Sequence, residues 1–271
     1  MRAWCNGSLV DPSGPAISVL DHGFTVGDGV FEAIKVVDNQ PFALTRHLQR
    51  LTRSATGLGL PEPDTDLVRE AIAATIDGQQ LAHGRIRVTY TAGISPLGSN
   101  RDTQDPTLTV VTAAAAPFPQ STKAAVVPWP RNEHGATTGL KTTSYADNVI
   151  ALAHAAERGA SEAIFANTAG DLCEGTGTNV FCVFDGTVVT PPLEAGCLAG
   201  VTRALVIEWY DVHERPISMA EFATADEVFL TSTTRDVQAV HAIDDRALDN
   251  HAVTEKVAAA WRAREPQDID P

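Results

Sequence analysis

The stretch Gly139-Leu140-Lys141-Thr142-Thr143-Ser144-Tyr145-Ala146-Asp147-Asn148 contains the lysine around which the chain is organised. The chain has only four lysines, and Lys141 is the one that lies among uncharged residues, just before an Ala-rich helical pattern. An amine in such a setting is partly desolvated, which lowers its pKa and frees the neutral form for attack on a carbonyl. A solvated surface lysine is the alternative, so the rest of the chain decides between the two.

The composition bounds the class of protein. The chain has 271 residues, of which 44% are hydrophobic, and this is ample for a buried core and for two domains. A net charge of -14 argues against nucleic acid or a membrane surface as the main partner, although a small anion could bind in a local basic pocket. No apolar run approaches the roughly 18 residues of a membrane span, and the N-terminal residues lack the apolar core of a signal peptide.

The four cysteines are scattered along the chain without the spacing of metal ligands. They are expected to be buried, reduced thiols, as is typical of a cytoplasmic protein, and no metal site is expected.

The pattern of apolar and turn residues predicts a small N-terminal domain over 1–114, a linker over 115–122 and a larger domain over 123–271. In the first domain, residues 3–10 and 16–20 are expected to be short strands on either side of a turn. Further strands are expected over 30–37, 84–90 and 107–113, and helices over 46–58 and 66–76. In the second domain we expect helices over 148–158, 198–209 and 253–264, and strands over 124–127, 163–166 and 228–230.

Two sets of arginines in the first half have open interpretations. Arg46, Arg50 and Arg53 fall on one side of the predicted helix, which is either a solvated face or a means of directing one guanidinium at a phosphate. Arg85 and Arg87 share one face of the predicted strand 84–90, which is either exposed to solvent or the lining of an anion-binding cavity.

Three segments of the second half contain candidate ligand-binding groups. Glu174 lies among small residues that allow a flat ligand to approach, although it could be an ordinary turn residue. The glycine and hydroxyl residue at Gly200-Val201-Thr202 begin a predicted helix, where free N–H groups could bind an anion, or Thr202 could be a plain N-cap. Thr231-Ser232-Thr233-Thr234 follows an apolar strand and forms a turn rich in hydrogen-bond donors.

Taken together, these segments resemble the class IV aminotransferases, the fold type IV enzymes that depend on pyridoxal 5'-phosphate. This group includes branched-chain, D-amino-acid and (R)-amine aminotransferases and 4-amino-4-deoxychorismate lyase. The matching segments appear in the family's order over nearly the whole chain. They are Gly27-Asp28-Gly29-Val30-Phe31-Glu32, Arg46-His47-Leu48-Gln49-Arg50-Leu51, Lys141, Glu174-Gly175, Thr178-Asn179-Val180-Phe181, Thr190-Pro191-Pro192, Leu198-Ala199-Gly200-Val201-Thr202-Arg203 and residues 226–233.

The resemblance implies an α+β fold with two domains, a small α/β domain and a larger domain with a β-barrel-like core. It implies a homodimer with the active site at the domain interface. Lys141 matches the lysine that binds the cofactor aldehyde and shuttles the proton, and Glu174 matches the carboxylate that pairs with the pyridine nitrogen. The other implied cofactor contacts are Arg50, Val201, Thr202, Ser232 and Thr233 on the phosphate, Leu198 on the ring face and Tyr145 near the phenolic oxygen.

Phe31, Arg85, Arg87 and Thr234 are the candidate substrate contacts. Arg87 matches an arginine of branched-chain aminotransferases, whereas residues 91–96 lack the arginine and histidine of the best-known D-amino-acid aminotransferases. The expected function is transamination between small amino acids and 2-oxo acids. D-amino acids and primary amines are candidate amino donors. The alternatives are an aminodeoxychorismate lyase that forms 4-aminobenzoate and pyruvate, and a non-catalytic cofactor-binding protein.

Overall fold

The structure, a computed structural model, describes residues 1–102 and 105–271 and divides into two compact units. Unit 1 comprises residues 1–117, 140–144 and 269–271, and unit 2 comprises residues 118–139 and 145–268. The segment 140–144, which carries Lys141, therefore packs with the N-terminal strands, although it lies far along the chain. The domain limits expected from the sequence stay a prediction.

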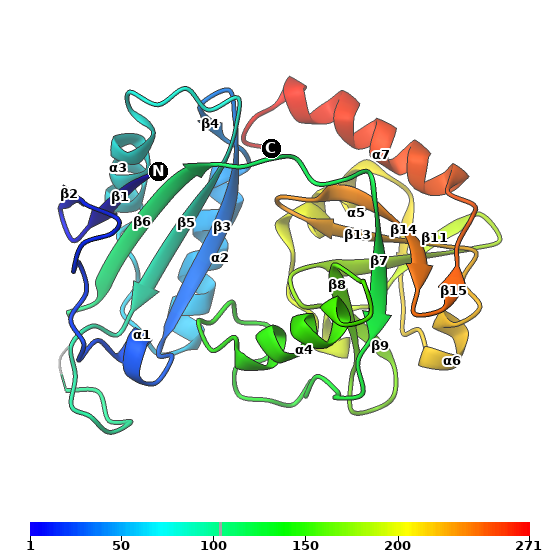
Figure 1. The fold of residues 1–271 in the computed structure, drawn as a ribbon, viewed down its shortest axis with the longest axis horizontal. Coiled ribbons are helices and arrows are strands. Elements are labelled where there is room, and N and C mark those ends of the chain that lie inside the picture. Colours follow the sequence, from blue (N-terminus) through cyan, green and yellow to red (C-terminus); the bar gives the residue numbers. More distant parts are fainter. Residues whose placement is uncertain (103–104) are drawn as a thin grey trace. The chain divides into compact units, whose positions relative to one another are not determined.

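Unit 1 is built on a six-stranded antiparallel sheet in the order β2-β1-β6-β5-β3-β4 (Figure 1). The strands are β1 Arg2–Cys5, β2 Ser8–Val10, β3 Gly29–Val37, β4 Gln40–Pro41, β5 His83–Thr91 and β6 Thr107–Ala114. Alternate residues of β5 are buried and exposed up to Val88, so Arg85 and Arg87 share the less buried face, as the sequence pattern predicts.

Helices α2 (Leu44–Gly57) and α3 (Thr65–Ile76) cover one face of this sheet, and the short α1 is His22–Thr25 (Figure 1). The core beneath the helices takes one row of β3, namely Val30, Ile34 and Val36, because side chains alternate along a strand. Phe31 consequently belongs to the opposite face of the sheet, and Glu32 belongs to the helix face.

Two expectations about the N-terminal segment are wrong. Residues 3–10 form two strands with a tight turn at Asn6-Gly7, where both residues have positive φ angles of 41° and 104°. Asn-Gly is the preferred pair for such a turn, because its backbone twist suits the two flanking strands. Residues 16–20 form no strand.

Segment 140–144 pairs with the first residues of β3 in unit 1. The Phe31 N–H donates to the Lys141 carbonyl at 3.0 Å, and the Thr143 N–H donates to the Gly29 carbonyl at 2.8 Å. Val30 and Thr142 are paired in antiparallel fashion. These bonds fix the backbone of Lys141 beside β3.

Unit 2 contains a nine-stranded mixed sheet in the order β12-β11-β10-β13-β14-β7-β8-β9, with β15 paired to β14. The strands are β7 Ser121–Val126, β8 Glu162–Ala166, β9 Leu172–Gly175, β10 Asn179–Phe184, β11 Thr187–Thr190, β12 Val212–Glu214, β13 Glu227–Ser232, β14 Asp236–Ile243 and β15 Arg246–Ala247. The helices are α4 Ala146–Ala156, η1 Leu193–Ala195, α5 Val201–Trp209, α6 Met219–Phe222, α7 Ala252–Arg264 and η2 Glu265–Gln267.

The sheet of unit 2 curls back on itself, since β9 at one end of the order also contacts β10. Its buried strands carry apolar side chains such as Phe181 and Phe229, whose rings stack with centroids 4.7 Å apart. Helices α5 and α7 pack on β13 and β14, and α4 packs on β7 and β8. The expected α+β fold with a barrel-like larger part is confirmed.

Among the described residues, no helix is both long enough and apolar enough to cross a membrane.

Candidate functional site

Lys141 lies in unit 1, where its backbone is held from two sides. Its N–H donates to the Ser54 hydroxyl of α2 at 3.1 Å, and its carbonyl accepts from β3. Gly57 of α2 leaves room for this segment, because a Cβ atom there would lie 2.7 Å from Leu140. The lysine is half-buried, so its position is set by the sheet and α2 together.

The side chain of Lys141 shares an aromatic neighbour with Arg87. The Lys141 Nζ lies 4.4 Å from the centroid of the Phe31 ring, and the Arg87 guanidinium carbon lies 3.9 Å from the same centroid. Arg87 also donates from Nε to the Thr89 hydroxyl at 3.3 Å. An aromatic ring attracts a cation through its quadrupole. Phe31 therefore holds an amine and a guanidinium on the face of the sheet opposite α2 and α3.

A buried charge cluster lies on the opposite face, between β3 and α2. The Arg50 guanidinium donates from Nε and Nη2 to the two carboxylate oxygens of Glu32, both at 2.7 Å. The His47 Nδ1 lies 2.7 Å from the Glu32 Oε2. Arg50 is therefore buried, whereas Arg46 is half-buried and Arg53 is exposed, so the three arginines do not form one solvated face.

The charge states in this cluster follow from its contacts. Burial alone would raise the pKa of Glu32, but the charge and hydrogen bonds of Arg50 and His47 hold that pKa far below its usual range. Burial lowers the pKa of His47, the charge of Glu32 opposes this, and the charges of Arg50 and Lys141 lower the pKa further. An ionised carboxylate only accepts, so a neutral His47 donates to Glu32 from Nδ1.

In unit 2, Glu174 of β9 has two positively polarised neighbours. Its Oε2 accepts from the Leu198 N–H at 2.9 Å, and its Oε1 lies 3.4 Å from the Arg131 Nε. The second contact is between charges rather than a hydrogen bond, since the Arg131 Nε has no hydrogen-bond partner among residues 1–102 and 105–271. Arg131 also lies over the Phe165 ring at 4.2 Å and donates to the Asn148 side-chain oxygen at 2.9 Å. Glu174 is thus a strand residue whose carboxylate is oriented by Leu198 and Arg131, and not a plain turn residue.

Asn179 of β10 links the loop that follows η1 to the sheet. Its side-chain amide donates to the Leu198 carbonyl at 2.9 Å. A Cβ atom on Gly200 would lie 2.0 Å from the Asn179 Oδ1, so this close approach requires glycine. Gly200 is the N-cap of α5, and no side chain in the described part of the chain caps that helix end. Thr202 is therefore not the N-cap, and one of its two sequence-based interpretations is wrong.

The hydroxyl-rich turn follows directly from β13. Thr231 pairs with Asn179 across β10 and β13, and its buried hydroxyl has no hydrogen-bond partner among the described residues. The Ser232 hydroxyl accepts from the Arg235 N–H at 3.2 Å. Arg235 is anchored by bonds to the Ser161 carbonyl at 2.9 Å and the Gln238 side chain at 2.6 Å. Ser232, Thr233 and Thr234 are all half-buried in this turn.

The sequence-predicted residues thus fall into two groups, one in each unit. Unit 1 contains Phe31, Arg50, Arg85, Arg87 and Lys141. Unit 2 contains Glu174, Leu198, Val201, Thr202, Ser232, Thr233 and Thr234, together with the half-buried Tyr145, which precedes α4.

Sequence reasoning missed four residues that hold these groups in place. Glu32, His47 and Asn179 lie inside quoted motifs but received no role. A signal for Glu32 existed, because it is a carboxylate in the apolar row of an alternating strand. Arg131 carried no signal, since its contact with Glu174 joins segments 43 residues apart in the numbering.

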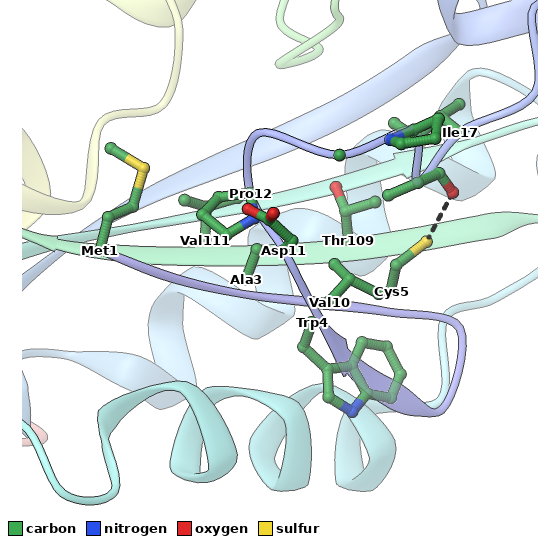
Figure 2. A pocket seen from close by; sticks show the side chains of 13 residues that line it. Met1, Ala3, Trp4, Cys5, Val10, Asp11, Pro12, Ile17, Thr109 and Val111 are labelled. Atoms are coloured by element: carbon green, nitrogen blue, oxygen red, sulfur yellow. Dashed lines mark hydrogen bonds between the residues drawn. The ribbon is translucent and has the colours of Figure 1, made fainter.

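The pocket in Figure 2 belongs to unit 1 and has a volume of about 380 Å³. It lies over strands β1 and β6, beneath the loop that follows β2, and Asp11 in that loop accepts from the Ser13 hydroxyl at 2.7 Å. None of the sequence-predicted residues lines it. The lining residues are Met1, Ala3, Trp4, Cys5, Val10, Asp11, Pro12, Gly14, Pro15, Ala16, Ile17, Thr109 and Val111.

The sequence is similar to those of known proteins. The sequence profile of the family described as Amino-transferase class IV matches residues 29–243. A putative branched-chain-amino-acid aminotransferase of Methanocaldococcus jannaschii is 33% identical over 265 residues, which cover 94% of this chain and 92% of that protein. A bifunctional aminodeoxychorismate lyase / D-amino acid transaminase of Mycobacterium tuberculosis is 29% identical over 290 residues, with 93% and 94% covered.

The fold is also that of solved relatives. The fold IV transaminase CpuTA1 of Curtobacterium pusillum superposes with a TM-score of 0.85 at 33% identity, over 96% of this chain and 92% of that one. The resemblance inferred from the motifs is confirmed, and the chain belongs to the class IV aminotransferase family of pyridoxal-phosphate-dependent enzymes.

Proposed function

We propose that this enzyme transfers an amino group between small amino acids, in either configuration, or primary amines and 2-oxo acids. The proposal rests on one cluster, on the face of unit 1's sheet opposite α2 and α3. In it, Lys141 and Arg87 both lie over the Phe31 ring. An amine can serve as the proton carrier, and a guanidinium beside it is suited to a substrate carboxylate.

The described residues fit pyridoxal phosphate in the chemistry of their donors. The cofactor needs an amine for its aldehyde, a carboxylate for its ring nitrogen and N–H or hydroxyl donors for its phosphate. Lys141 supplies the amine and Glu174 the carboxylate. The uncapped start of α5 at Val201 and Thr202, and the hydroxyls of Ser232 and Thr233, supply donors for an anion. We propose Arg50 as a further phosphate contact, Leu198 as the residue on the ring face and Tyr145 as the partner of the phenolic oxygen.

When bound, the cofactor withdraws electrons from the carbon that bears the substrate amine, so that this carbon can lose a proton. Lys141 would accept that proton at Nζ and would donate it again to complete the transfer of the amino group. Glu174 would pair with the ring nitrogen, and its Leu198 and Arg131 contacts orient its carboxylate. Arg87 holds the substrate carboxylate, with Arg85 and Thr234 as further substrate contacts.

The lyase remains the second candidate, because a relative carries both activities in its name. The two reactions share the first proton transfer. The lyase substrate is a ring with two carboxylates, and a pocket for it would also use the basic face of β5. Arg85 and Arg87 are therefore compatible with both candidate activities. The relatives that are named only as an aminotransferase or a transaminase favour transamination.

We also propose that the protein is a homodimer. Unit 1 exposes apolar side chains from two segments that lie together, since the Ser95 N–H donates to the Leu20 carbonyl at 3.3 Å. Phe24 is 75% exposed and Leu97 is 80% exposed. Several large exposed apolar side chains on neighbouring segments are typical of an interface between proteins. The other exposed members are Ile17, Val19, Leu20, Val26 and Ile94.

A cytoplasmic location is proposed from the cysteines. All four are buried and unpaired, as expected where thiols stay reduced.

Replacing Lys141 by alanine is expected to remove covalent cofactor attachment. Purified protein should be yellow, and borohydride should trap the cofactor on Lys141 in the wild type but not in Lys141→Ala. Turnover should fall by at least about a hundredfold, because a positioned proton carrier is lost. Lys256→Ala, in an exposed part of α7, is the control and should behave as wild type. Cofactor trapped on another lysine in Lys141→Ala would refute the assignment.

A half-reaction panel distinguishes the two candidate activities. Holoenzyme is mixed with L- and D-amino acids and with primary amines, and loss of the absorbance of the lysine-bound cofactor is recorded. We expect at least one simple amino donor, with a 2-oxo acid, to give steady multi-turnover exchange. No exchange with any donor, together with release of 4-aminobenzoate and pyruvate from aminodeoxychorismate, would establish the lyase instead.

Gly200→Ala is expected to weaken cofactor binding. Its Cβ atom would lie 2.0 Å from the Asn179 Oδ1 and would displace the start of α5. Loss of a charge-assisted hydrogen bond to phosphate corresponds to roughly a tenfold to hundredfold rise in the dissociation constant. Gly177→Ala is the control, because nothing lies within 4 Å of its added Cβ atom. Equal cofactor affinity in the two variants would show that this helix end binds no phosphate.

Phe24→Asp is expected to dissociate the dimer, since it places a charge in the exposed apolar surface of unit 1. Leu67→Asp, on the outer side of α3 where the leucine is 38% exposed, should leave the dimer intact. Light scattering after size-exclusion chromatography measures both. A monomeric wild type, or a dimer that survives Phe24→Asp, would argue against this surface.

A further inference from the structure

Glu32 is the one charged member of an otherwise apolar row. Along β3, the row that faces the helices consists of Val30, Glu32, Ile34 and Val36, and Glu32 is 0% exposed. A buried carboxylate without partners is strongly unfavourable, so its partners account for its presence. Those partners are Arg50 and His47 of α2, which lie one helical turn apart.

The contact between Glu32 and Arg50 has a defined direction. The guanidinium uses its Nε and Nη2 edge, with both hydrogen bonds at 2.7 Å, and Arg50 is itself only 5% exposed. Such a two-point pair fixes the plane of the guanidinium as well as its distance. Glu32 therefore determines the direction in which the Nη1 end of Arg50 points.

His47 fixes Glu32 in turn. Its Nδ1 donates to Oε2, the same oxygen that accepts from the Arg50 Nη2. The carboxylate is thus held from two positions on α2, and the rotation of its plane is restricted. The cluster joins α2 to β3 through charge-assisted hydrogen bonds, which are directional. Apolar packing alone at this place would not fix a direction.

We propose that Glu32 is a positioning residue, which orients the Arg50 guanidinium so that it binds the phosphate of the cofactor. The proposal rests on the assignment of Arg50 to the phosphate in the proposed function. Glu32 acts through Arg50 and not by contact with the cofactor.

Glu32→Gln tests this role because it changes charge and not shape. A glutamine presents one acceptor and one donor, so one of the two Arg50 donors would face an NH₂ group and the two-point pair would break. The packing volume stays the same. The expected result is a loss of orientation of Arg50 in a folded protein.

The measurement compares two ligands of the apo-protein, pyridoxal phosphate and pyridoxal, which lacks the phosphate. For Glu32→Gln we expect the dissociation constant of pyridoxal phosphate to rise about tenfold to a hundredfold. The dissociation constant of pyridoxal should change by less than about twofold. Arg50→Ala should show the same selective loss, and the double variant should lose no more than Arg50→Ala, because residues in one network are not additive.

Two further variants keep the test decisive. Arg50→Lys retains the positive charge but has no planar fork, so we expect a selective loss similar to that of Glu32→Gln. Glu227→Gln is the matched control, since Glu227 is also buried and accepts from the Val253 and Thr254 N–H groups of α7. It should leave the ratio of the two dissociation constants unchanged. If Glu32→Gln fails to fold, Arg50→Lys and Arg50→Ala still measure the need for orientation.

The outcomes separate the two assignments. An unchanged ratio in Arg50→Ala would remove Arg50 from the phosphate and overturn the proposal with it, whereas Lys141 and the proposed reaction would be unaffected. A changed ratio in Arg50→Ala with an unchanged ratio in Glu32→Gln would overturn the positioning role alone. Equal weakening of both ligands in Glu32→Gln, with a lowered melting temperature of the apo-protein, would show a purely structural role.

Discussion

The backbone pairing between segment 140–144 and the start of β3 is the constraint on which unit 1 depends. Two hydrogen bonds, at 3.0 Å and 2.8 Å, attach a segment from the middle of the chain to the sheet of the N-terminal strands. Because the backbone of Lys141 is fixed in this way, its side chain reaches Phe31, which also contacts Arg87. An amine on a free loop would sample many positions, whereas a paired strand holds it near one.

Each unit also holds a buried or half-buried carboxylate against an arginine, but the two pairs differ in kind. Glu32 and Arg50 form a two-point pair at 2.7 Å in the core of unit 1. Glu174 and Arg131 are 3.4 Å apart, and Glu174 takes its hydrogen bond from the Leu198 backbone instead. A two-point pair fixes the plane of the arginine, whereas the Glu174 carboxylate is oriented mainly by a backbone N–H. This difference matches the roles proposed for Arg50 and Glu174.

In unit 2 a single amide organises the segments proposed to bind phosphate. Asn179 bonds to Leu198, contacts Gly200 closely and pairs with Thr231 across the sheet. The start of α5 and the turn after β13 therefore share one support. Small residues are needed here because backbone, not side chain, approaches the amide, and Gly200 has no Cβ atom to prevent it.

The sequence by itself determined the elements and the candidate chemistry. Helices α2, α3, α4, α5 and α7 and strands β3, β5, β6, β7, β8 and β13 followed from local periodicity, and Lys141, Glu174 and Arg87 followed from ordered motifs. The Asn6-Gly7 dipeptide also predicts the turn, although the apolar pattern predicts a single strand over residues 3–10. Only the tertiary structure decided that 140–144 packs with unit 1, that Arg50 pairs with Glu32 and that Gly200, not Thr202, caps α5. Periodicity and turns depend on residues a few positions apart, whereas these contacts depend on which distant segments pack together, and no local pattern encodes that.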